Sequence, residues 1–258
     1  MANLFIKQAM QYAKGRPSYP AELFRFIAEK TPEHKLAWDV GTGSGQAAKS
    51  LAEHYEKVIA TDTSPKQLEL APKLPNIRYE HTSPTMPKEE LRQKVAPESS
   101  VDLVAVAQAI HWFDLPVFYE QARWVLKKPH GVIAAWCYTL PEVSPDMDAV
   151  LQKFYENPFW DPERKMVDNA YVDLEFPFQP LSGLEGTGPF RFKNERTMNL
   201  DDYFIYLKSW SAYQKAKEQG VELLTQGMIE DFTSAWNSDG ESGSKSVNYP
   251  VYLRIGKV

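Results

Sequence analysis

The chain has 258 residues, a formal net charge of −5 and a single cysteine, Cys137. One cysteine excludes a disulfide within the chain and a cysteine zinc cluster, and the negative net charge argues against a nucleic-acid surface. The five histidines are scattered without metal-ligand spacing, so we expect no metal site. The first residues hold too short an apolar run for a signal peptide, and no stretch of 18 apolar residues occurs. We therefore expect a cytoplasmic protein with no membrane segment and no obligate protein partner.

The first 35 residues precede the regular alternation of strands and helices and are expected to form a separate head segment. Within it, Gly15–Pro20 carries two prolines in four positions, which favours a rigid extended turn. Tyr12, Arg16 and Tyr19 project from this region. Two interpretations stay open: the segment anchors a lid, or it places Tyr12 and Arg16 over a ligand.

A strand, a glycine turn and a helix follow in immediate succession. Leu36–Val40 is a short and largely apolar run typical of a buried parallel strand. Three glycines at 41, 43 and 45 come next, and residues 46–54 are predicted to be helical. Glycines suit such a turn because the backbone must bend tightly and a ligand can lie against it without a Cβ in the way.

Two acidic residues flank this turn and indicate what kind of ligand it takes. Asp62 ends the second predicted strand, where an acid in this kind of unit accepts hydrogen bonds from ribose hydroxyls. Asp39 lies two residues before the first glycine, and the turn contains no lysine or arginine. That charge pattern suits an amine and a sulfonium better than a pyrophosphate. The alternative is that the glycines only allow the helix to pack on the strand.

With an acid followed by G-x-G-x-G, the chain resembles the class I S-adenosylmethionine-dependent methyltransferases. The resemblance implies S-adenosyl-L-methionine as cofactor and an α/β fold, a Rossmann-like, doubly wound, seven-stranded mixed sheet with a helical and loop cap over the substrate site. Further strands are expected over 76–81, 101–107 and 130–138. The cofactor contacts that the resemblance implies are Tyr12, Arg16, Asp39, Gly41, Thr42, Gly43, Gly45, Asp62, Thr63, Ser83, Ala107, Gln108 and Ala109. The usual acid after the third strand is missing, and Glu80, Thr82 and Ser83 are the options at that position.

The heptapeptide Gln108–Asp114, Q-A-I-H-W-F-D, follows the fourth predicted strand. This strand end adjoins the crevice where the strand order reverses, which is where ligands bind in such sheets. The string, together with the Tyr-x3-Arg-Pro-x-Tyr-Pro head pattern, is similar to the trans-aconitate methyltransferase-like subgroup. His111 is the candidate catalytic residue, either as a general base or as a group that orients a loop by hydrogen bonds. Trp112 has two readings, core packing or substrate wall.

After Thr139 the alternation lapses, and we expect a substrate-cap insertion over 139–213 within a single domain. Helices are predicted over 144–156, 202–208 and 221–236, a long aromatic loop over 157–181, a sixth strand over 189–197 and a closing strand over 247–256. The string S-W-S-A-Y at 209–213 resembles the acceptor-site string of the same subgroup. The expected acceptor contacts are Tyr19, Trp112, Trp136, Tyr138, Trp160, Trp210 and Tyr213.

These features predict methyl transfer from S-adenosylmethionine to a small organic molecule. A carboxylate acceptor is ionised at neutral pH and needs no base, so a methyl ester is the expected product. A phenol or amine acceptor would instead require His111 as base. Two alternatives from other classes are a nicotinamide-dependent oxidoreductase and a non-catalytic cofactor-binding protein.

Overall fold

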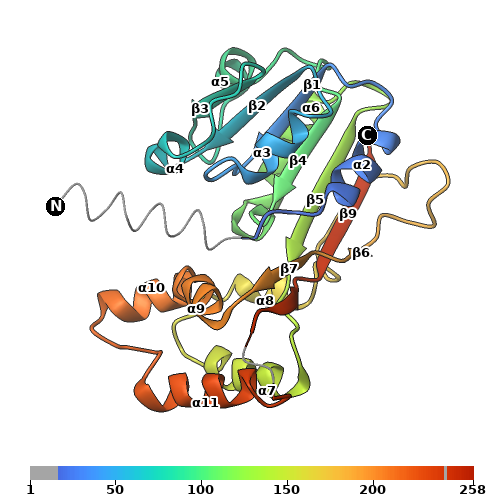
Figure 1. The fold of residues 1–258 in the computed structure, drawn as a ribbon. Coiled ribbons are helices and arrows are strands. Elements are labelled where there is room, and N and C mark those ends of the chain that lie inside the picture. Colours follow the sequence, from blue (N-terminus) through green and yellow to red (C-terminus); the bar gives the residue numbers. More distant parts are fainter. Residues whose placement is uncertain (1–16, 241–242) are drawn as a thin grey trace. The chain divides into compact units, whose positions relative to one another are not determined.

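A computed structural model describes residues 17–240 and 243–258 of the chain, and its ribbon is shown in Figure 1. The chain divides into two compact units. The first, here called the sheet unit, consists of Ser18–Thr139, Lys165–Phe192 and Val251–Val258. The second unit contains Leu140–Arg164 and Lys193–Pro250. Among the described residues, none of the helices combines the length and the apolar content needed to cross a bilayer.

The sheet unit is built on seven strands in the spatial order β3-β2-β1-β4-β5-β9-β6. The first five strands along the chain pair in parallel, and β9 pairs antiparallel with both β5 and β6. This arrangement confirms the predicted doubly wound, seven-stranded mixed sheet. The strands are β1 (Leu36–Val40), β2 (Lys57–Asp62), β3 (Ile77–His81), β4 (Leu103–Ala107), β5 (Val132–Tyr138), β6 (Phe190–Phe192) and β9 (Val251–Lys257).

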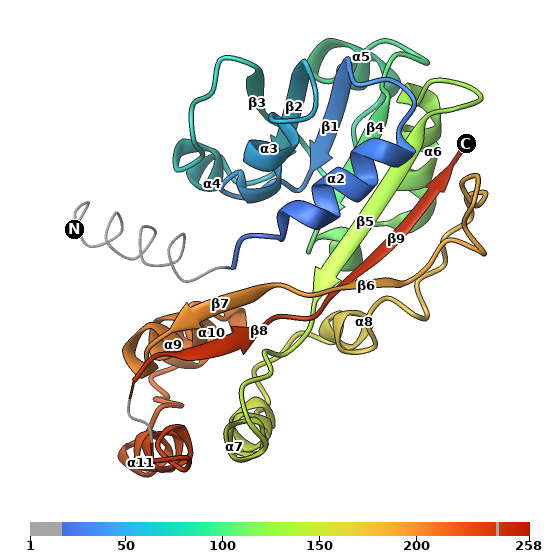
Figure 2. The same cartoon turned by 45° about the vertical axis from the view of Figure 1, so that its right-hand side comes forward.

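Helices cover both faces of this sheet, which is why its central strands are largely apolar. Figure 2 shows α2 and α3 on one face and α6 on the other. The helices of the sheet unit are α2 (Ala21–Lys30), α3 (Gln46–Leu51), α4 (Pro65–Glu69), α5 (Lys88–Lys94) and α6 (Leu115–Val125). The short helix α8 (Arg164–Asp168) lies where the chain passes from the second unit back to the sheet unit.

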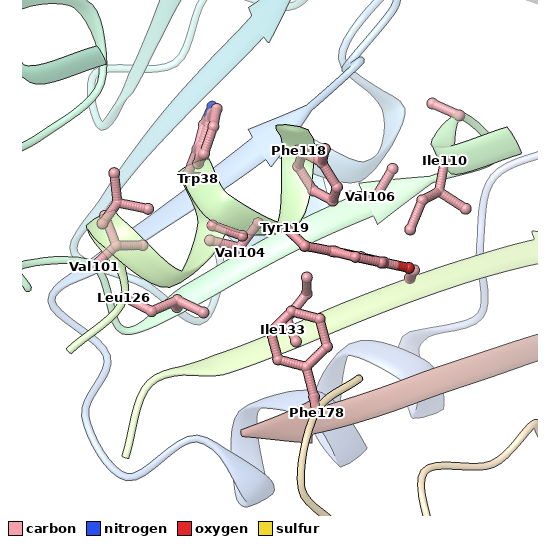
Figure 3. Close-up of a cluster of buried hydrophobic side chains, with 14 of the residues drawn as sticks. Trp38, Val101, Val104, Val106, Ile110, Phe118, Tyr119, Leu126, Ile133 and Phe178 are labelled. Atoms are coloured by element: carbon pink, nitrogen blue, oxygen red, sulfur yellow. The ribbon is translucent and has the colours of Figure 1, made fainter. Parts of the chain in front are cut away.

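Strand β5 shows how side-chain alternation divides the core between the two faces. All seven of its residues are buried. Ile133, Ala135 and Cys137 belong to the cluster that packs under α6, part of which Figure 3 shows. Trp136 points to the opposite face, where its ring meets Phe24 of α2 at a centroid distance of 5.8 Å. Cys137 is therefore a buried member of this apolar cluster.

The strand order reverses between β1 and β4, since the chain proceeds outward from β1 to β3 and then returns to add β4 on the other side. At such a switch point the loops after the two adjacent strands diverge to opposite faces of the sheet. The carboxyl ends of β1 and β4 carry the glycine turn and the Gln108–Asp114 heptapeptide. The topology thus places both sequence motifs at one edge of the sheet.

The described residues of the second unit form four helices and a two-stranded sheet in which β7 pairs antiparallel with β8. Aromatic rings form much of its interior, and Phe154 contacts both Trp210 and Phe232 at centroid distances of 5.8 Å. The Asn199 side chain caps the helix that begins at Leu200 by accepting a hydrogen bond from the Asp202 N–H. The elements are α7 (Pro145–Tyr155), β7 (Glu195–Met198), α9 (Leu200–Lys208), α10 (Ser211–Glu218), α11 (Gln226–Trp236) and β8 (Lys245–Asn248).

Several element predictions were wrong in detail. The single strand expected over 189–197 is two strands, β6 and β7, which lie in different sheets. The closing strand is likewise divided, because Pro250 has no N–H to continue a ladder between β8 and β9. Helix α11 begins at Gln226 rather than Val221, since Thr225 supplies its cap by accepting from the Met228 N–H.

Two further findings concern short helices, and the first of them corrects a prediction. The loop expected over 157–181 contains α8. At the start of α4 the Ser64 side chain makes no cap hydrogen bond; the Ser64 N–H instead donates to Asp62 Oδ1 at 2.8 Å.

Candidate functional site

In the turn that follows β1, three glycines at alternate positions have a left-handed backbone conformation. The φ angles are +68° at Gly41, +57° at Gly43 and +80° at Gly45, a region that residues with a Cβ rarely adopt. A Cβ on Gly41 would lie 2.8 Å from Ala109 Cβ, and one on Gly45 would lie 2.6 Å from Tyr79 Oη. The outer glycines therefore permit close packing within the protein.

Gly43 differs from its neighbours in this respect. A Cβ built on it meets no atom of residues 17–240 or 243–258 within 4 Å. Within this part of the chain its backbone faces open space, which is the condition for a ligand to lie directly against the chain. The middle glycine is thus the position of the turn that fits a bound molecule.

Asp62 joins the end of β2 to this turn. Its Oδ2 accepts from the Gly43 N–H and its Oδ1 from the Ser64 N–H, both at 2.8 Å. The side chain is half-buried, and each carboxylate oxygen can accept more than one hydrogen bond. Asp62 is consequently held beside Gly43 by backbone bonds while retaining acceptor capacity for a ribose diol. Thr63, the next residue, is exposed.

Asp39 lies below the turn and is fully buried. Its Oδ2 accepts from Thr42 Oγ1 at 2.5 Å, whereas its Oδ1 has no hydrogen-bond partner among the described residues. Burial, with a smaller contribution from the negative charge of Asp62, raises the pKa of Asp39 to about 7. Because this carboxyl has no exposed surface, its charge acts on a ligand at the turn through the electrostatic field and through Thr42.

Gln108 holds the ends of β4 and β5 together. It has a left-handed φ of +55°, and its N–H donates to the Trp136 carbonyl at 2.8 Å. Its side-chain Oε1 accepts from the Tyr138 N–H at 2.8 Å, and its Nε2 donates to the Tyr138 carbonyl at 3.3 Å. The carboxamide is thus engaged with the backbone, and any ligand contact near Ala107–Ala109 falls to main-chain groups.

Three of the predicted acceptor contacts form one aromatic group in the sheet unit. The Tyr19 ring lies 5.6 Å from that of Trp136 and 6.2 Å from that of Tyr138. Trp136 is fully buried and Tyr138 is 4% exposed. Tyr19 is the half-buried member, so it is the ring of this group with the most solvent-accessible surface.

His111 and Trp112 lie in the single turn of 3-10 helix η1 (Ile110–Trp112) that follows β4. His111 is buried, and its Nδ1 is 3.0 Å from the Tyr171 hydroxyl. Trp112 is 53% exposed, an unusual state for so large an apolar ring. The heptapeptide therefore presents an anchored imidazole beside an exposed indole.

The remaining predicted residues are distributed as follows. Trp160 and Trp210 contact each other in the second unit at a centroid distance of 5.3 Å. In the same unit the Tyr213 hydroxyl donates to Glu222 Oε1 at 2.8 Å. Ser83 is exposed after β3, and its hydroxyl donates to the Thr85 carbonyl at 3.2 Å. Tyr12 and Arg16 lie outside the described residues.

Sequence reasoning missed Tyr79 and Tyr171. The Tyr79 hydroxyl is buried over Gly45 without a hydrogen-bond partner in the described chain, and burial raises the pKa of this phenol to about 12. Its signal was the alternation of β3, which points Ile77 and Tyr79 the same way. Tyr171 lies in a stretch without periodicity, so no local pattern marked it.

In the described residues, no three histidine, cysteine, aspartate or glutamate side chains gather closely enough to hold a metal ion.

Comparison with known proteins agrees with this geometry. The family model for a methyltransferase domain matches residues 38–135, which include the turn, Asp62 and the heptapeptide. A Dictyostelium discoideum protein named as a methyltransferase is 35% identical over 255 residues, covering 95% of this chain and 91% of the relative. CRG1 of Saccharomyces cerevisiae, named as an S-adenosylmethionine-dependent methyltransferase, is 26% identical over 239 residues, with coverages of 80% and 79%.

Among solved structures, a type II methyltransferase from Anaeromyxobacter dehalogenans is similar in both sequence and fold. The TM-score is 0.78 at 33% identity, and the match covers 94% of this chain and 97% of the other. A glycine turn open at Gly43, an acid fixed beside it and relatives of nearly full length lead to one conclusion. The chain belongs to the class I S-adenosylmethionine-dependent methyltransferases, and S-adenosylmethionine is its cofactor.

Proposed function

We propose that this methyltransferase acts on the carboxylate of a small organic acid and produces a methyl ester. S-adenosylmethionine supplies an electrophilic methyl group on a sulfonium. A carboxylate oxygen forms the new O–CH3 bond as the C–S bond breaks, and the sulfonium becomes a neutral thioether. No proton moves in this step, because a carboxylate is already ionised at neutral pH.

The observation that carries this proposal is the chemistry of the side chains at the carboxyl ends of the strands. Asp39 is buried and Asp62 is engaged with the glycine turn. His111, next to the exposed Trp112, is the remaining candidate base among the residues that the sequence assigned to this edge. A reaction that needs positioning and exclusion of water, and no base, fits such a site.

The residues we assign to the cofactor follow from the contacts described above. The Gly43 backbone and the Asp62 carboxylate would hold the ribose side, with Asp39 supplying negative charge beneath the turn when its carboxyl is ionised and Thr42 hydrogen-bonded to that carboxyl. The backbone at Ala107, Gln108 and Ala109 would border the other side. Tyr12, Arg16, Thr63 and Ser83 remain proposed contacts from the resemblance alone.

Acceptor binding is assigned to aromatic side chains. Trp112 and Tyr19 have exposed surface in the sheet unit, and Trp136 and Tyr138 would support Tyr19 from behind. Trp160, Trp210 and Tyr213 are proposed to contribute from the segment 139–213. We propose that the whole chain works as one methyltransferase domain of the trans-aconitate methyltransferase-like subgroup, in the cytoplasm, without nucleic acid or an obligate protein partner.

A second candidate is methylation of a phenol or an amine, favoured by His111 itself. A phenol or ammonium group must lose a proton, and histidine is the side chain whose ordinary pKa suits that role near neutral pH. In that case the imidazole would need an unprotonated nitrogen directed at the acceptor.

A matched acceptor panel separates the two candidates. Each set shares one apolar skeleton and differs only in carrying a carboxylate, a hydroxyl or an amine. Initial rates of transfer of a labelled methyl group are measured for all three members at fixed S-adenosylmethionine. Our proposal predicts labelling of the carboxylate member, whereas labelling confined to the hydroxyl or amine members would contradict it.

A further inference from the structure

Asp39 is a fully buried acid near the end of β1 to which the described chain offers no positive charge. Its Oδ2 accepts from Thr42 Oγ1 at 2.5 Å, and its Oδ1 has no hydrogen-bond partner among the described residues. Within residues 17–240 and 243–258, no lysine or arginine offsets the charge of Asp39. A carboxylate without a counter-charge is costly to bury, so the protonated carboxyl is favoured until a cation arrives.

Asp102 shows the opposite arrangement at the other end of the same sheet. It is also buried, and its Oδ2 accepts from the N–H groups of Lys35 and Leu36 at 2.9 and 2.8 Å. Its Oδ1 forms an ion pair with Lys127 Nζ at 2.5 Å. Asp39 and Asp102 are the buried acids of the described chain, and of these two Asp102 has a cation of its own. The missing counter-charge is thus at the ligand end of the sheet.

The side chains that pack against Asp39 from neighbouring elements are apolar. Trp38 belongs to the cluster under α6, so the alternation of β1 directs Asp39 to the opposite face, which α2 and α3 cover (Figure 2). The register partners of Asp39 on β2 and β4 are Ala60 and Ala105, and the buried residues of α2 and α3 are apolar. From α3, the backbone N–H of Ala48 favours the ionised form of the carboxyl.

The charged and ionisable side chains around Asp39 are Asp62, Tyr79 and Lys73. Burial, opposed by the Thr42 hydroxyl and reinforced by the negative charge of Asp62, raises the pKa of Asp39 to about 7. Burial also raises the pKa of the Tyr79 phenol, to about 12, so this group keeps its proton in the neutral range. Lys73 Nζ lies over the Tyr79 ring, 5.0 Å from its centroid. Asp39 therefore changes its protonation state near neutral pH.

Methyl transfer changes the charge of the molecule bound beside Asp39 by one unit. S-adenosylmethionine carries a positive sulfonium, whereas the demethylated product, S-adenosylhomocysteine, has a neutral thioether and is otherwise the same molecule. A nearby positive charge favours the ionised form of a carboxyl, and unit charges about 10 Å apart in a partly buried site shift a pKa by about one unit. The pKa of Asp39 should therefore be lower in the cofactor complex than in the product complex.

We propose that Asp39 discriminates S-adenosylmethionine from its demethylated product, because its carboxyl releases a proton to solvent when the cofactor binds and regains one after the methyl group has left. The carboxyl ionises by loss of H+ and is neutralised by uptake of H+, so no further reactant is needed. The charge change at sulfur is the same for every acceptor. The inference therefore goes beyond the proposed formation of a methyl ester and does not depend on it.

The pH dependence of cofactor and product binding follows from this linkage. Below the pKa of Asp39 in the cofactor complex, the carboxyl is protonated in both complexes, and the preference for the cofactor is smallest. Above its pKa in the product complex, the carboxyl is ionised in both, and the preference is largest. Between about pH 5.5 and about pH 8.5, the ratio of product Kd to cofactor Kd should rise about tenfold for a pKa difference of about one unit.

Calorimetry on the full-length wild type counts the released protons without any substitution. Titrations with S-adenosylmethionine and with S-adenosylhomocysteine at about pH 6.5, in buffers of different ionisation enthalpy, give the number of protons released per ligand bound. With a pKa of about 7 in the free protein, we expect release of about half a proton with the cofactor and clearly less with the product. Equal proton numbers for the two ligands would overturn the inference.

Asp39→Asn tests whether Asp39 is the responsible group, because the amide has nearly the same shape and cannot ionise. The Kd values of both ligands are measured across the same pH range in the wild type and in the variant. Titration of the ligands themselves is common to both proteins, so the difference between the proteins isolates Asp39. We expect the Kd ratio to rise about tenfold more in the wild type. An equal rise in the two proteins would contradict the assignment.

Two variants of Thr42 keep the assignment testable if Asp39→Asn does not fold. Thr42→Val removes the hydroxyl that donates to Asp39 Oδ2, and Thr42→Ser keeps a hydroxyl at this position. Losing the donor disfavours the ionised carboxyl, so the midpoint of the rise in the Kd ratio should move up by about one pH unit in Thr42→Val. It should stay in place in Thr42→Ser. An unmoved midpoint in Thr42→Val would show that another group releases the proton.

Discussion

The carboxamide of Gln108 hydrogen-bonds both backbone groups of Tyr138, accepting from its N–H at 2.8 Å and donating to its carbonyl at 3.3 Å. The main chain turns away from β5 at Gln108, which has a left-handed φ. The Gln108 side chain therefore makes the hydrogen bonds to Tyr138 that a continued β4 backbone would make. The pair joins the ends of β4 and β5, from which the His111 turn begins.

Gln108→Ala should lower the free energy of unfolding by about 2–3 kcal/mol, because it leaves both backbone groups of the buried Tyr138 without these bonds. Urea unfolding measures the loss. Gln93→Ala is the matched control, since that carboxamide bonds the exposed Glu89 side chain and its loss should cost less than about 0.5 kcal/mol. Equal effects in the two variants would argue against a bracing role for Gln108.

Asp62→Ala should raise the Kd for S-adenosylmethionine about 10–150-fold, equivalent to about 1.5–3 kcal/mol of lost charge-assisted hydrogen bonds. Part of the loss comes from releasing the Gly43 N–H that Asp62 now holds. Isothermal titration calorimetry measures the change.

Glu56→Ala is the control for Asp62→Ala, because it removes the same charge just before the opposite end of β2. It should leave the Kd within about twofold of the wild-type value. An unaltered Kd in Asp62→Ala would remove this residue from the cofactor site.

Asp39 should make the stability of the protein fall as pH rises from about 4 to about 7. Burial raises the pKa of its carboxyl from 3.8 to about 7 in the folded state, so the folded state binds an additional proton in this interval. The stabilisation is complete below the unfolded-state pKa and is lost once pH exceeds the folded-state pKa. The shift corresponds to at most roughly 4 kcal/mol.

Comparison with Asp39→Asn isolates this contribution, because the amide cannot ionise. Free energies of unfolding are measured by urea titration at several pH values. As pH rises, the stability of the wild type should fall relative to that of Asp39→Asn, with no further change above about pH 8. A gap between the two proteins that stays constant with pH would show that Asp39 ionises normally.

Gly45→Ala should destabilise the protein, and Tyr79→Phe should relieve part of that loss. The added methyl group would lie 2.6 Å from the Tyr79 hydroxyl oxygen, which Tyr79→Phe removes. In a double-mutant cycle we expect a favourable coupling of about 1 kcal/mol. The residual cost reflects the left-handed φ of +80°. Strict additivity would mean that Tyr79 does not limit the space at Gly45.

The alternation of apolar runs and helices was sufficient to predict the sheet, because parallel strands buried on both faces are uninterrupted apolar segments. The place of Asp62 at the end of β2 was predicted correctly for the same reason, since it follows from the strand's own pattern. The division between β8 and β9 was not found, although Pro250 marks it, because the alternation continues on both sides.

Long-range partners were beyond sequence reasoning. The bonds from Gln108 to Tyr138 and from Tyr171 to His111 span 30 and 60 positions, and no local periodicity encodes them. The same holds for Arg254, whose bonds to the Tyr171 and Leu174 carbonyls span 83 and 80 positions. A charged residue inside the apolar strand β9 was the available signal that a buried polar network existed there.

The most direct test of the account is the chemical nature of the transferred methyl group together with its dependence on His111. A labelled product is made from S-adenosylmethionine and a carboxylic acid, by the wild type and by His111→Ala, and is treated with mild base. The account predicts release of the label as methanol, and a turnover number in His111→Ala within about tenfold of the wild type, because no proton has to be removed. A label that survives base, with turnover reduced at least about a hundredfold in His111→Ala, would contradict it and make His111 a general base.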